Sequence, residues 1–207
     1  VDRAKKVVVI GDLFADMISK VRGFPETGGR TFGTSFMRNS GGTGGNIAAG
    51  LAVLGMEASI VCGLGDDENG EFLLEELKQS GVNTEHVKVT AGLKSGAVPI
   101  MVDEDGERVI YVLVKGSAFE AIEPEDLLFL EEMNPDVLCF TGVIIGAHPV
   151  EESAILAARR WKGRAKLYFD PNLCYPADQV PEEIKKATRE LADLCDVVLT
   201  GETEMRA

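Results

Sequence analysis

The stretch Ser40-Gly41-Gly42-Thr43-Gly44-Gly45-Asn46 and the apolar residues after it decide how this chain is interpreted. Glycine packs poorly and costs conformational entropy, so four glycines within five residues indicate a backbone that bends sharply or approaches a ligand closely. Ile47, Leu51 and Leu54 recur at helical spacing and predict a helix directly after the glycines. The first amides of a helix lack partners inside it, so the sequence predicts a site for a polar or anionic ligand; a flexible connector is the alternative.

Composition excludes several kinds of protein. The 207 residues carry a net charge of −13, whereas surfaces that bind nucleic acid or anionic membranes need clustered Lys and Arg, so neither partner is expected. No apolar run is long enough to cross a bilayer. The two histidines and the absence of a Cys-x-x-Cys pair make a zinc site improbable. Three of the four cysteines fall in apolar runs, which predicts reduced thiols in the cytoplasm (Cys62, Cys139, Cys174 and Cys195).

Short apolar runs alternate with amphipathic stretches along most of the chain. The apolar runs predict strands at 6–10, 58–62, 136–141, 166–169 and 196–200. The amphipathic stretches predict helices at 68–79, 124–133, 151–161 and 182–194, the first of them capped by Asp67. This alternation is typical of an α/β fold with a mostly parallel sheet flanked by helices on both faces.

The first predicted strand is followed by two carboxylates, Asp12 and Asp16. In an open parallel sheet ligands bind beyond the carboxyl ends of the strands, so both side chains are candidates to accept hydrogen bonds from sugar hydroxyls or to hold a cation. The alternative for both is turn and cap chemistry, which is common for Asp after a strand.

Two segments interrupt the alternation. Residues 18–38 predict irregular or short-stranded structure, with a short strand over 18–21. Residues 97–114 predict a β-hairpin with Asp105-Gly106 at its turn. Both faces of the hairpin are apolar, so we expect a second copy of the protein to cover one of them, giving a homodimer. Packing as an antiparallel edge against a neighbouring loop is the alternative.

Familiar catalytic motifs are missing from the sequence. It contains no P-loop and no Gly-x-Ser-x-Gly nucleophile elbow. Its glycine run does not match the Gly-x-Gly-x-x-Gly fingerprint and does not directly follow the first strand, which disfavours a dinucleotide-binding site.

The remaining motifs resemble those of the ribokinase-like (PfkB) carbohydrate kinases along the whole chain. The matching residues are Val9-Ile10-Gly11-Asp12 with Asp16, Gly41-Gly42-Thr43-Gly44-Gly45-Asn46 with Gly55, Gly65-Asp66-Asp67 with Gly70, the hairpin at 97–114, and Asp170-Pro171-Asn172. The resemblance implies a ribokinase-like α/β domain, incomplete over residues 1–207, with a small β lid formed by approximately 13–38 and 97–114.

The resemblance also implies a reaction: transfer of the γ-phosphate of ATP, with Mg²⁺, to a hydroxyl of a sugar or nucleoside. It assigns acceptor binding to Asp16, Gly42, Gly44 and Asn46, and it makes Gly41-Gly42 the hinge of a closing lid. Gly41 and Thr43, in the same turn, are also candidate substrate-binding residues, and Asp12 joins them as a carboxylate after the strand. Lys115, on or near the lid, completes the candidate substrate-binding residues as a possible partner for an acidic sugar, which ranks second to a neutral one.

Other parts of the family pattern are not matched. The family's catalytic Asp, at a Gly-Ala-Gly-Asp helix start, and its nucleotide pocket are expected beyond residue 207. We therefore assign no catalytic residue and no direct metal ligand, and we expect these 207 residues alone to be inactive. The family's Asn-x-x-Glu motif corresponds to Gly201-Glu202-Thr203-Glu204, so Glu204 is the residue assigned to phosphate and metal. Phe14 stands where relatives often have a polar residue, and Cys174 stands where they often have an Arg. A non-catalytic module that binds a sugar or nucleoside is the alternative function.

Overall fold

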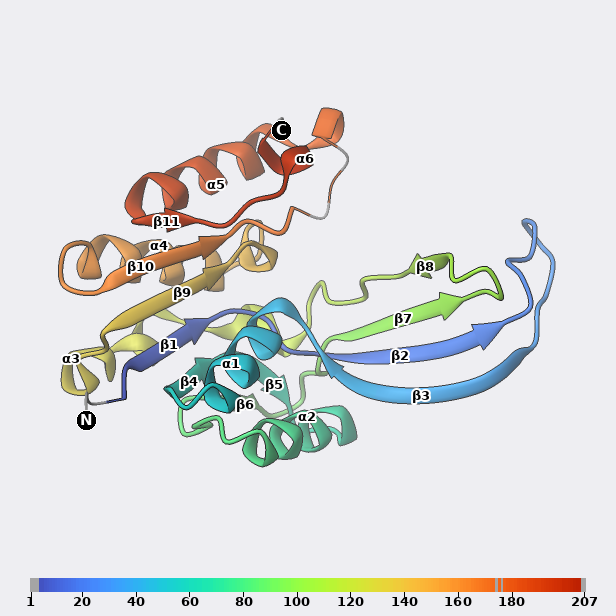
Figure 1. Ribbon diagram of the computed structural model, residues 1–207, viewed down its shortest axis with the longest axis horizontal. Helices are drawn as coiled ribbons and strands as arrows, with labels where there is room; N and C mark the ends of the chain where they lie inside the picture. Colours follow the sequence, from blue (N-terminus) through green and yellow to red (C-terminus); the bar gives the residue numbers. More distant parts are fainter. Residues whose placement is uncertain (1–3, 174, 176, 206–207) are drawn as a thin grey trace.

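The strand β1 (Lys6–Ile10) is hydrogen-bonded on both sides, to β4 (Glu57–Val61) and to β9 (Val137–Thr141). Two further strands, β10 (Lys166–Asp170) and β11 (Val197–Val198), extend a parallel sheet in the order β11-β10-β9-β1-β4. The computed structural model describes residues 4–173, 175 and 177–205 (Figure 1), so Cys174 lies outside the described residues. The predicted α/β class with a mostly parallel sheet is confirmed.

Alternate residues of β1 belong to two apolar cores, one on each face of the sheet, because successive side chains of a strand point to opposite sides. Val8 and Ile10 pack in a core that includes residues of α4 (Val150–Trp161) and α5 (Glu182–Leu194). Val9 packs in a second core with residues of α1 (Thr43–Val53) and α2 (Glu68–Gln79). Helices therefore cover both faces, as the continuous apolar runs of the strands require.

A second sheet projects from the end of this body, at the right of Figure 1. It contains β2 (Phe14–Val21), β3 (Gly33–Gly41), β7 (Ala97–Val102) and β8 (Arg108–Ile110) in the order β3-β2-β7-β8; we call it the projecting sheet. The short strand predicted over 18–21 is part of β2, which is longer and begins at Phe14, and β3 occupies much of what was predicted to be irregular or short-stranded. β2 pairs along its whole length with β3, and such pairing overrides weak strand propensity.

The predicted helix over 124–133 is broken into two pieces. The structure has a 3-10 turn, Pro124–Leu127, and one helical turn, α3 (Leu130–Met133). Leu127, at the end of the 3-10 turn, and Leu130, at the start of α3, are both buried in the core that also holds residues of α4, so both pieces pack against that core.

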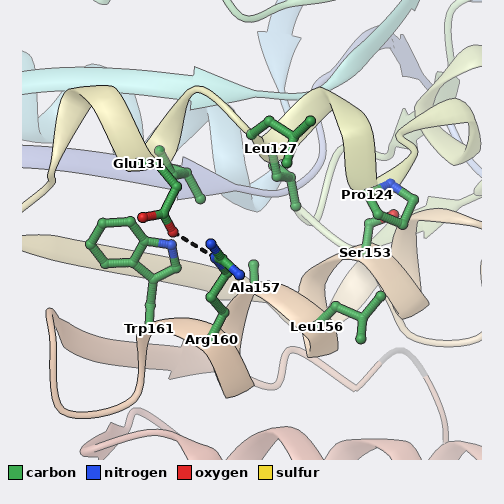
Figure 2. A pocket seen from close by; sticks show the side chains of 10 residues that line it. Pro124, Leu127, Glu131, Ser153, Leu156, Ala157, Arg160 and Trp161 are labelled. Atoms are coloured by element: carbon green, nitrogen blue, oxygen red, sulfur yellow. Dashed lines mark hydrogen bonds and ion pairs between the residues drawn. The ribbon is translucent and has the colours of Figure 1, made fainter.

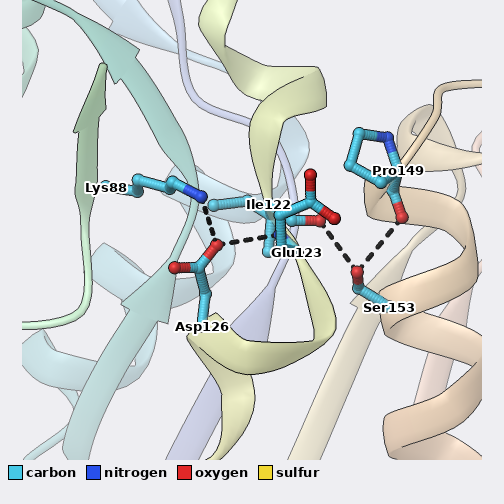
Figure 3. A network of polar contacts seen from close by, with 6 residues as sticks. All are labelled: Lys88, Ile122, Glu123, Asp126, Pro149 and Ser153. Carbon is cyan, nitrogen blue, oxygen red and sulfur yellow. Dashed lines mark hydrogen bonds and ion pairs between the residues drawn. The ribbon is translucent and has the colours of Figure 1, made fainter. Parts of the chain in front are cut away.

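Polar contacts join this part of the chain to Lys88, at the start of the short strand β6, and to Ser153 of α4 (Figure 3). Asp126 Oδ2 accepts hydrogen bonds from Lys88 Nζ at 2.6 Å and from the backbone amide of Glu123 at 2.8 Å. On the other side, the buried Ser153 Oγ donates to the carbonyl oxygen of Ile122 at 2.8 Å. The contact between Asp126 and Glu123 is local, whereas those of Lys88 and Ser153 span 38 and 31 positions and could not be read from local sequence patterns.

The remaining elements are short. β5 (Gly63–Gly65) and β6 (Lys88–Thr90) form a two-stranded parallel sheet, and α6 (Glu202–Met205) is the last helix of the described residues. Three further 3-10 turns connect the larger elements: Ala118–Ala121, Gly142–Ile144 and Ala177–Gln179. The strand predicted over 196–200 is limited to the two residues of β11, which pairs with β10 alone.

The N-terminus of α2 confirms the predicted cap. Asp67 Oδ1 accepts a hydrogen bond from the amide of Gly70 at 2.9 Å, and Oδ2 accepts one from the amide of Ser95 at 3.1 Å. Burial alone would raise the pKa of Asp67, but these hydrogen bonds outweigh it and hold the pKa below its ordinary value. Asp67 therefore fixes both α2 and the chain that leads into β7.

The helices cover the two faces of the main sheet unequally. On the α1 side, an apolar groove of about 340 Å³ lies over the carboxyl-terminal strands. Ile47 and Leu51 of α1 form one wall of the groove, Leu199 lines it beyond β11, and Tyr168 and Asp170 of β10 contribute to its lining. In the described part of the chain, no helix combines the length and apolar character that crossing a membrane would need.

Candidate functional site

Chain segments far apart in sequence meet beyond the carboxyl ends of β1, β9 and β10. Asp12 follows β1, Thr141 ends β9, and Asp170 ends β10. The glycine turn lies among them, because β3 ends at Gly41 and α1 begins at Thr43. This is the edge of a parallel sheet where ligands bind.

Asp12 is the central group of this site and is only 1% exposed. Its Oδ2 accepts a hydrogen bond from the amide of Thr43 at 2.8 Å. Its Oδ1 accepts hydrogen bonds from the amide of Gly44 at 3.2 Å and from Thr141 Oγ1 at 2.8 Å. Asp12 therefore ties the ends of β1 and β9 to the first turn of α1.

These contacts correct the expectation that the first amides of α1 are free for an anionic ligand. The amides of Thr43 and Gly44 donate to the Asp12 carboxylate, and the amide of Gly45 donates to the Asp12 carbonyl oxygen at 2.9 Å. The amide of Asn46 donates to the carbonyl oxygen of Gly42 at 3.0 Å. A carboxylate of the protein thus occupies the place at the helix N-terminus that an anion would take.

Two glycines allow carboxylates to approach the turn closely. Gly42 has a φ of 88°, which L-residues rarely adopt, and a Cβ there would lie 2.8 Å from Asp12 Oδ2. A Cβ on Gly41 would lie 2.2 Å from Asp16 Oδ2. Asp12, which follows β1, and Asp16, on β2, therefore lie against consecutive residues of the same turn.

Asp16 lies on β2, opposite Asn39 of β3 and Val98 of β7. It is half-buried, and its carboxylate accepts no hydrogen bond from any described residue. Burial, and then the negative charge of Asp12, raise the pKa of Asp16 above its ordinary value. Asp16 is thus a partly desolvated acceptor beside the glycine turn.

The other predicted substrate-binding residues have different surroundings. Thr43 Oγ1 accepts a hydrogen bond from Asn172 Nδ2 at 2.6 Å. Asn46 lies exposed on the first turn of α1, and Lys115 lies exposed after β8, with no ion pair to any residue that the structure describes. The structure therefore brings Asp12, Asp16 and Thr43 to the turn but gives Lys115 no contact there.

Glu204 lies on α6, at the neighbouring end of β10. Its Oε1 accepts a hydrogen bond from the amide of Leu173 at 2.9 Å, and its Oε2 accepts one from the amide of Gly201 at 2.8 Å. The pKa of Asp170 is raised above its ordinary value, chiefly by burial and also by the negative charges of Glu204 and Asp12. A hydrogen bond from the Asn172 backbone lowers this pKa but does not outweigh them. Among the described residues, no three His, Cys, Asp or Glu side chains are grouped so that they could hold a metal ion.

One family of known proteins matches almost the whole chain. Residues 4–207 match the pfkB family of carbohydrate kinases. The chain belongs to this family. The resemblance read from the glycine turn and the accompanying motifs is thereby confirmed.

Curated relatives of this pfkB-family chain are sugar kinases. Mouse ribokinase is 33% identical over 126 residues, which are 61% of this chain and 38% of that protein. The aminoimidazole riboside kinase of Salmonella typhimurium is 28% identical over 197 residues, 93% of this chain and 57% of that protein. A fructokinase of Klebsiella pneumoniae is 27% identical over 202 residues, 97% of this chain and 61% of that protein. The pfkB-family chain thus spans from 38% to 61% of the length of these relatives.

Solved structures show the same fold and confirm that it is ribokinase-like. An uncharacterized sugar kinase from Pyrococcus horikoshii superposes with a TM-score of 0.80 at 26% identity, covering 96% of this chain and 64% of that one. That kinase has also been solved in complex with ATP. A PfkB protein from a Polaromonas species gives a TM-score of 0.84 at 26% identity, covering 98% and 67% of the two chains.

A second cavity, of about 190 Å³, lies away from this site (Figure 2). It is bounded by the broken segment before β9 and by α4, where Arg160 Nε donates to Glu131 Oε1 at 2.6 Å. None of its residues lies at the carboxyl end of a sheet strand. We therefore take the glycine turn as the candidate site.

Two residues of the site were not among the predicted site residues. Thr141 donates to Asp12, and Asn172 donates to Thr43, each across 129 positions of sequence. A polar residue at the end of an apolar strand was the available signal for both. The sequence around Thr141 and Asn172 does not indicate which residues they contact, because each pair meets only in the folded protein.

Proposed function

We propose that this chain forms the acceptor-binding part of a pfkB-family kinase that transfers the γ-phosphate of ATP to a hydroxyl of an uncharged sugar or nucleoside. The observation that carries the proposal is the half-buried Asp16 carboxylate beside the Gly41-Gly42 turn, in a chain that matches the family over residues 4–207. Asp16 accepts hydrogen bonds from acceptor hydroxyls, and Asp12 holds the turn. Gly42, Gly44, Asn46 and Thr43 form the adjoining wall.

The charge of the site supports an uncharged acceptor. The negative charge of Asp12 acts on Asp16 and on Asp170, and that of Glu204 acts on Asp170, where in both cases it raises the pKa. No described Lys or Arg is paired with any of these four carboxylates. The cross-strand neighbours of Asp16 are Asn39 and Val98, which are both uncharged. A phosphorylated or acidic sugar would meet like charge at a few ångströms, where repulsion in a partly buried site is several kcal/mol at most and about 1 kcal/mol in water.

The projecting sheet supports a mechanism in which water is excluded from the site. It is joined to the body through the Gly41-Gly42 turn, and we propose that it acts as a lid that closes over the acceptor. Phosphoryl transfer depends mainly on positioning and charge neutralisation, which ATP-bound Mg²⁺ supplies. Mg²⁺ usually binds through one or two carboxylates, phosphates and water, so Glu204 and Asp170 fit this role without a cage of three protein ligands.

The experiment pairs neutral sugars with charged counterparts in titration calorimetry of the chain. D-ribose and D-fructose are compared with ribose 5-phosphate and fructose 6-phosphate, and a purine riboside is included. We expect at least one neutral compound to bind and its phosphate to bind at least about tenfold more weakly. Turnover is then measured with Mg²⁺-ATP on the full-length gene product. Tighter binding of the phosphates would contradict the proposed acceptor, and binding without turnover would favour a sugar-binding module.

We also propose that the projecting sheet mediates a homodimer. Apolar side chains are exposed along its two edges, including Phe36 at 68% on β3 and Leu113 at 61% after β8. Met37 on β3, and Ile110, Tyr111 and Val112 on or after β8, are further exposed apolar residues along these two edges. Exposed apolar surface on a sheet is a common site of association between copies.

The dimer is tested by sedimentation of the wild-type chain and two matched variants. We expect the wild type to sediment at twice the chain mass of 22.2 kDa and Phe36→Glu to sediment as a monomer. Val53→Glu is the control, because Val53 is an apolar residue on α1 of the body that is at least as exposed as Phe36, at 78%. A monomeric wild type, or equal dissociation of both variants, would refute a dimer through this sheet.

A further inference from the structure

A side-chain hydrogen bond joins the end of β10 to the glycine turn. Asn172 follows β10 by two residues, and its Nδ2 donates to Thr43 Oγ1 at 2.6 Å. Thr43 is the first residue of α1, and its own amide donates to Asp12. The Thr43 side chain and backbone are therefore held from two directions, by Asn172 and by Asp12.

The backbone of Asn172 is in an unfavourable conformation. Its φ is 36°, and in the described part of the chain Asn134 is the other non-glycine residue with positive φ. Asn134 ends the helical turn α3, where the left-handed conformation is common. Asn172 ends no helix. Left-handed residues away from helix ends cost about 1–3 kcal/mol and gather at functional sites.

The residue after Asn172 leads to the other side of the site. The amide of Leu173 donates to Glu204 Oε1 at 2.9 Å, so adjacent residues contact the glycine turn and the Glu204 carboxylate. Pro171 on the preceding side packs against the end of β9, where a Cβ on Gly142 would lie 1.5 Å from the Pro171 carbonyl oxygen. The residues on both sides of Asn172 are therefore held in place, and this fixes the position of its side-chain amide.

We propose that Asn172 is a positioning residue of the acceptor site. By holding Thr43 Oγ1, it fixes the first turn of α1 and, through the Asp12 contacts, the Gly42-to-Gly44 backbone beside Asp16. Asn172 need not touch the acceptor. This role rests on the proposed function, because it assigns the turn to acceptor binding.

Three single variants and one double variant test the role of Asn172. Asn172→Gly keeps the left-handed backbone accessible and removes the amide, and Thr43→Val keeps the shape of Thr43 without its hydroxyl. Asn134→Gly is the matched control, because it makes the same change at the other left-handed asparagine. We expect Asn172→Gly and Thr43→Val each to weaken neutral-sugar binding by roughly tenfold, the effect of losing one hydrogen bond of ordinary strength. The double variant should be no weaker than either single variant, and Asn134→Gly should bind like the wild type.

A second readout needs no sugar. Amide hydrogen exchange over residues 43–46 should be faster in Asn172→Gly and in Thr43→Val than in the wild type and in Asn134→Gly. Unchanged exchange in Asn172→Gly would overturn the proposal, as would additive losses of affinity in the double variant. If the wild type binds no neutral sugar, the proposed function fails, and the exchange experiment alone still decides whether Asn172 holds the turn.

Discussion

Replacing Asp12 with alanine should lower the free energy of unfolding by about 3 kcal/mol or more, because three donors around this buried carboxylate lose their acceptor at once. The donors are the amides of Thr43 and Gly44 and the Thr141 hydroxyl. In a chain of this size, that loss corresponds to a fall of roughly 6–12 °C in the midpoint of thermal unfolding. Sugar binding should weaken as well, since the Gly42 turn loses the group that fixes it.

The matched control for this variant is Asp66→Ala. Asp66 also accepts a hydrogen bond from a backbone amide, that of Gly92 at 2.9 Å, but Asp66 is exposed to solvent. Its replacement should lower the free energy of unfolding by no more than about 1 kcal/mol, because water can serve the freed amide. Scanning calorimetry of both variants makes the comparison. Equal midpoints would show that the buried Asp12 contacts are not what holds the turn.

Replacing Asp16 with alanine should lower the affinity for a neutral sugar by roughly 10- to 150-fold, the effect of losing one charge-assisted hydrogen bond of about 1.5–3 kcal/mol. The same variant should be as stable as the wild type or slightly more stable at neutral pH. The folded-state pKa of Asp16 is raised, so its contribution to stability is present below the unfolded-state pKa and is lost as the pH rises through the folded-state pKa. At neutral pH the ionised Asp16 therefore costs stability, and its removal relieves that cost.

A loss of sugar affinity without a loss of stability in Asp16→Ala would distinguish a binding role from a structural one. Asp105→Ala is the control, because Asp105 lies exposed at the hairpin turn of the same projecting sheet. Titration calorimetry and thermal unfolding of the two variants give the comparison. A loss of stability in Asp16→Ala, or unchanged affinity, would remove Asp16 from the acceptor site.

The raised pKa of Asp16 also predicts a pH dependence in the wild type. A carboxylate accepts hydrogen bonds from sugar hydroxyls best when it is ionised. Sugar affinity should therefore fall as the pH falls through the Asp16 pKa, beginning at a higher pH than an ordinary Asp would require. In Asp16→Asn this decline should be absent.

The sequence by itself determined the α/β class, most strands of the main sheet and the position of the glycine turn. These features follow from the local spacing of apolar residues, which can be read without knowing which segments pack together. α2 and α5, for example, match their predicted ranges of 68–79 and 182–194. Predictions from spacing failed where contacts with distant segments decide the local structure. β2 and β3 form long strands through mutual pairing, and the segment at 124–133 divides into a 3-10 turn and one helical turn, where Asp126 contacts the distant Lys88.

Tertiary structure decided how the candidate site is built. The sequence indicated Asp12, Asp16 and the glycines, but it left the helix amides free for an anion, and the fold gives them to Asp12. It also did not indicate that Thr141 and Asn172 would reach the turn. Each of these contacts joins residues at least 31 positions apart, and such pairs become neighbours only when parallel strands align their carboxyl ends at one edge of the sheet.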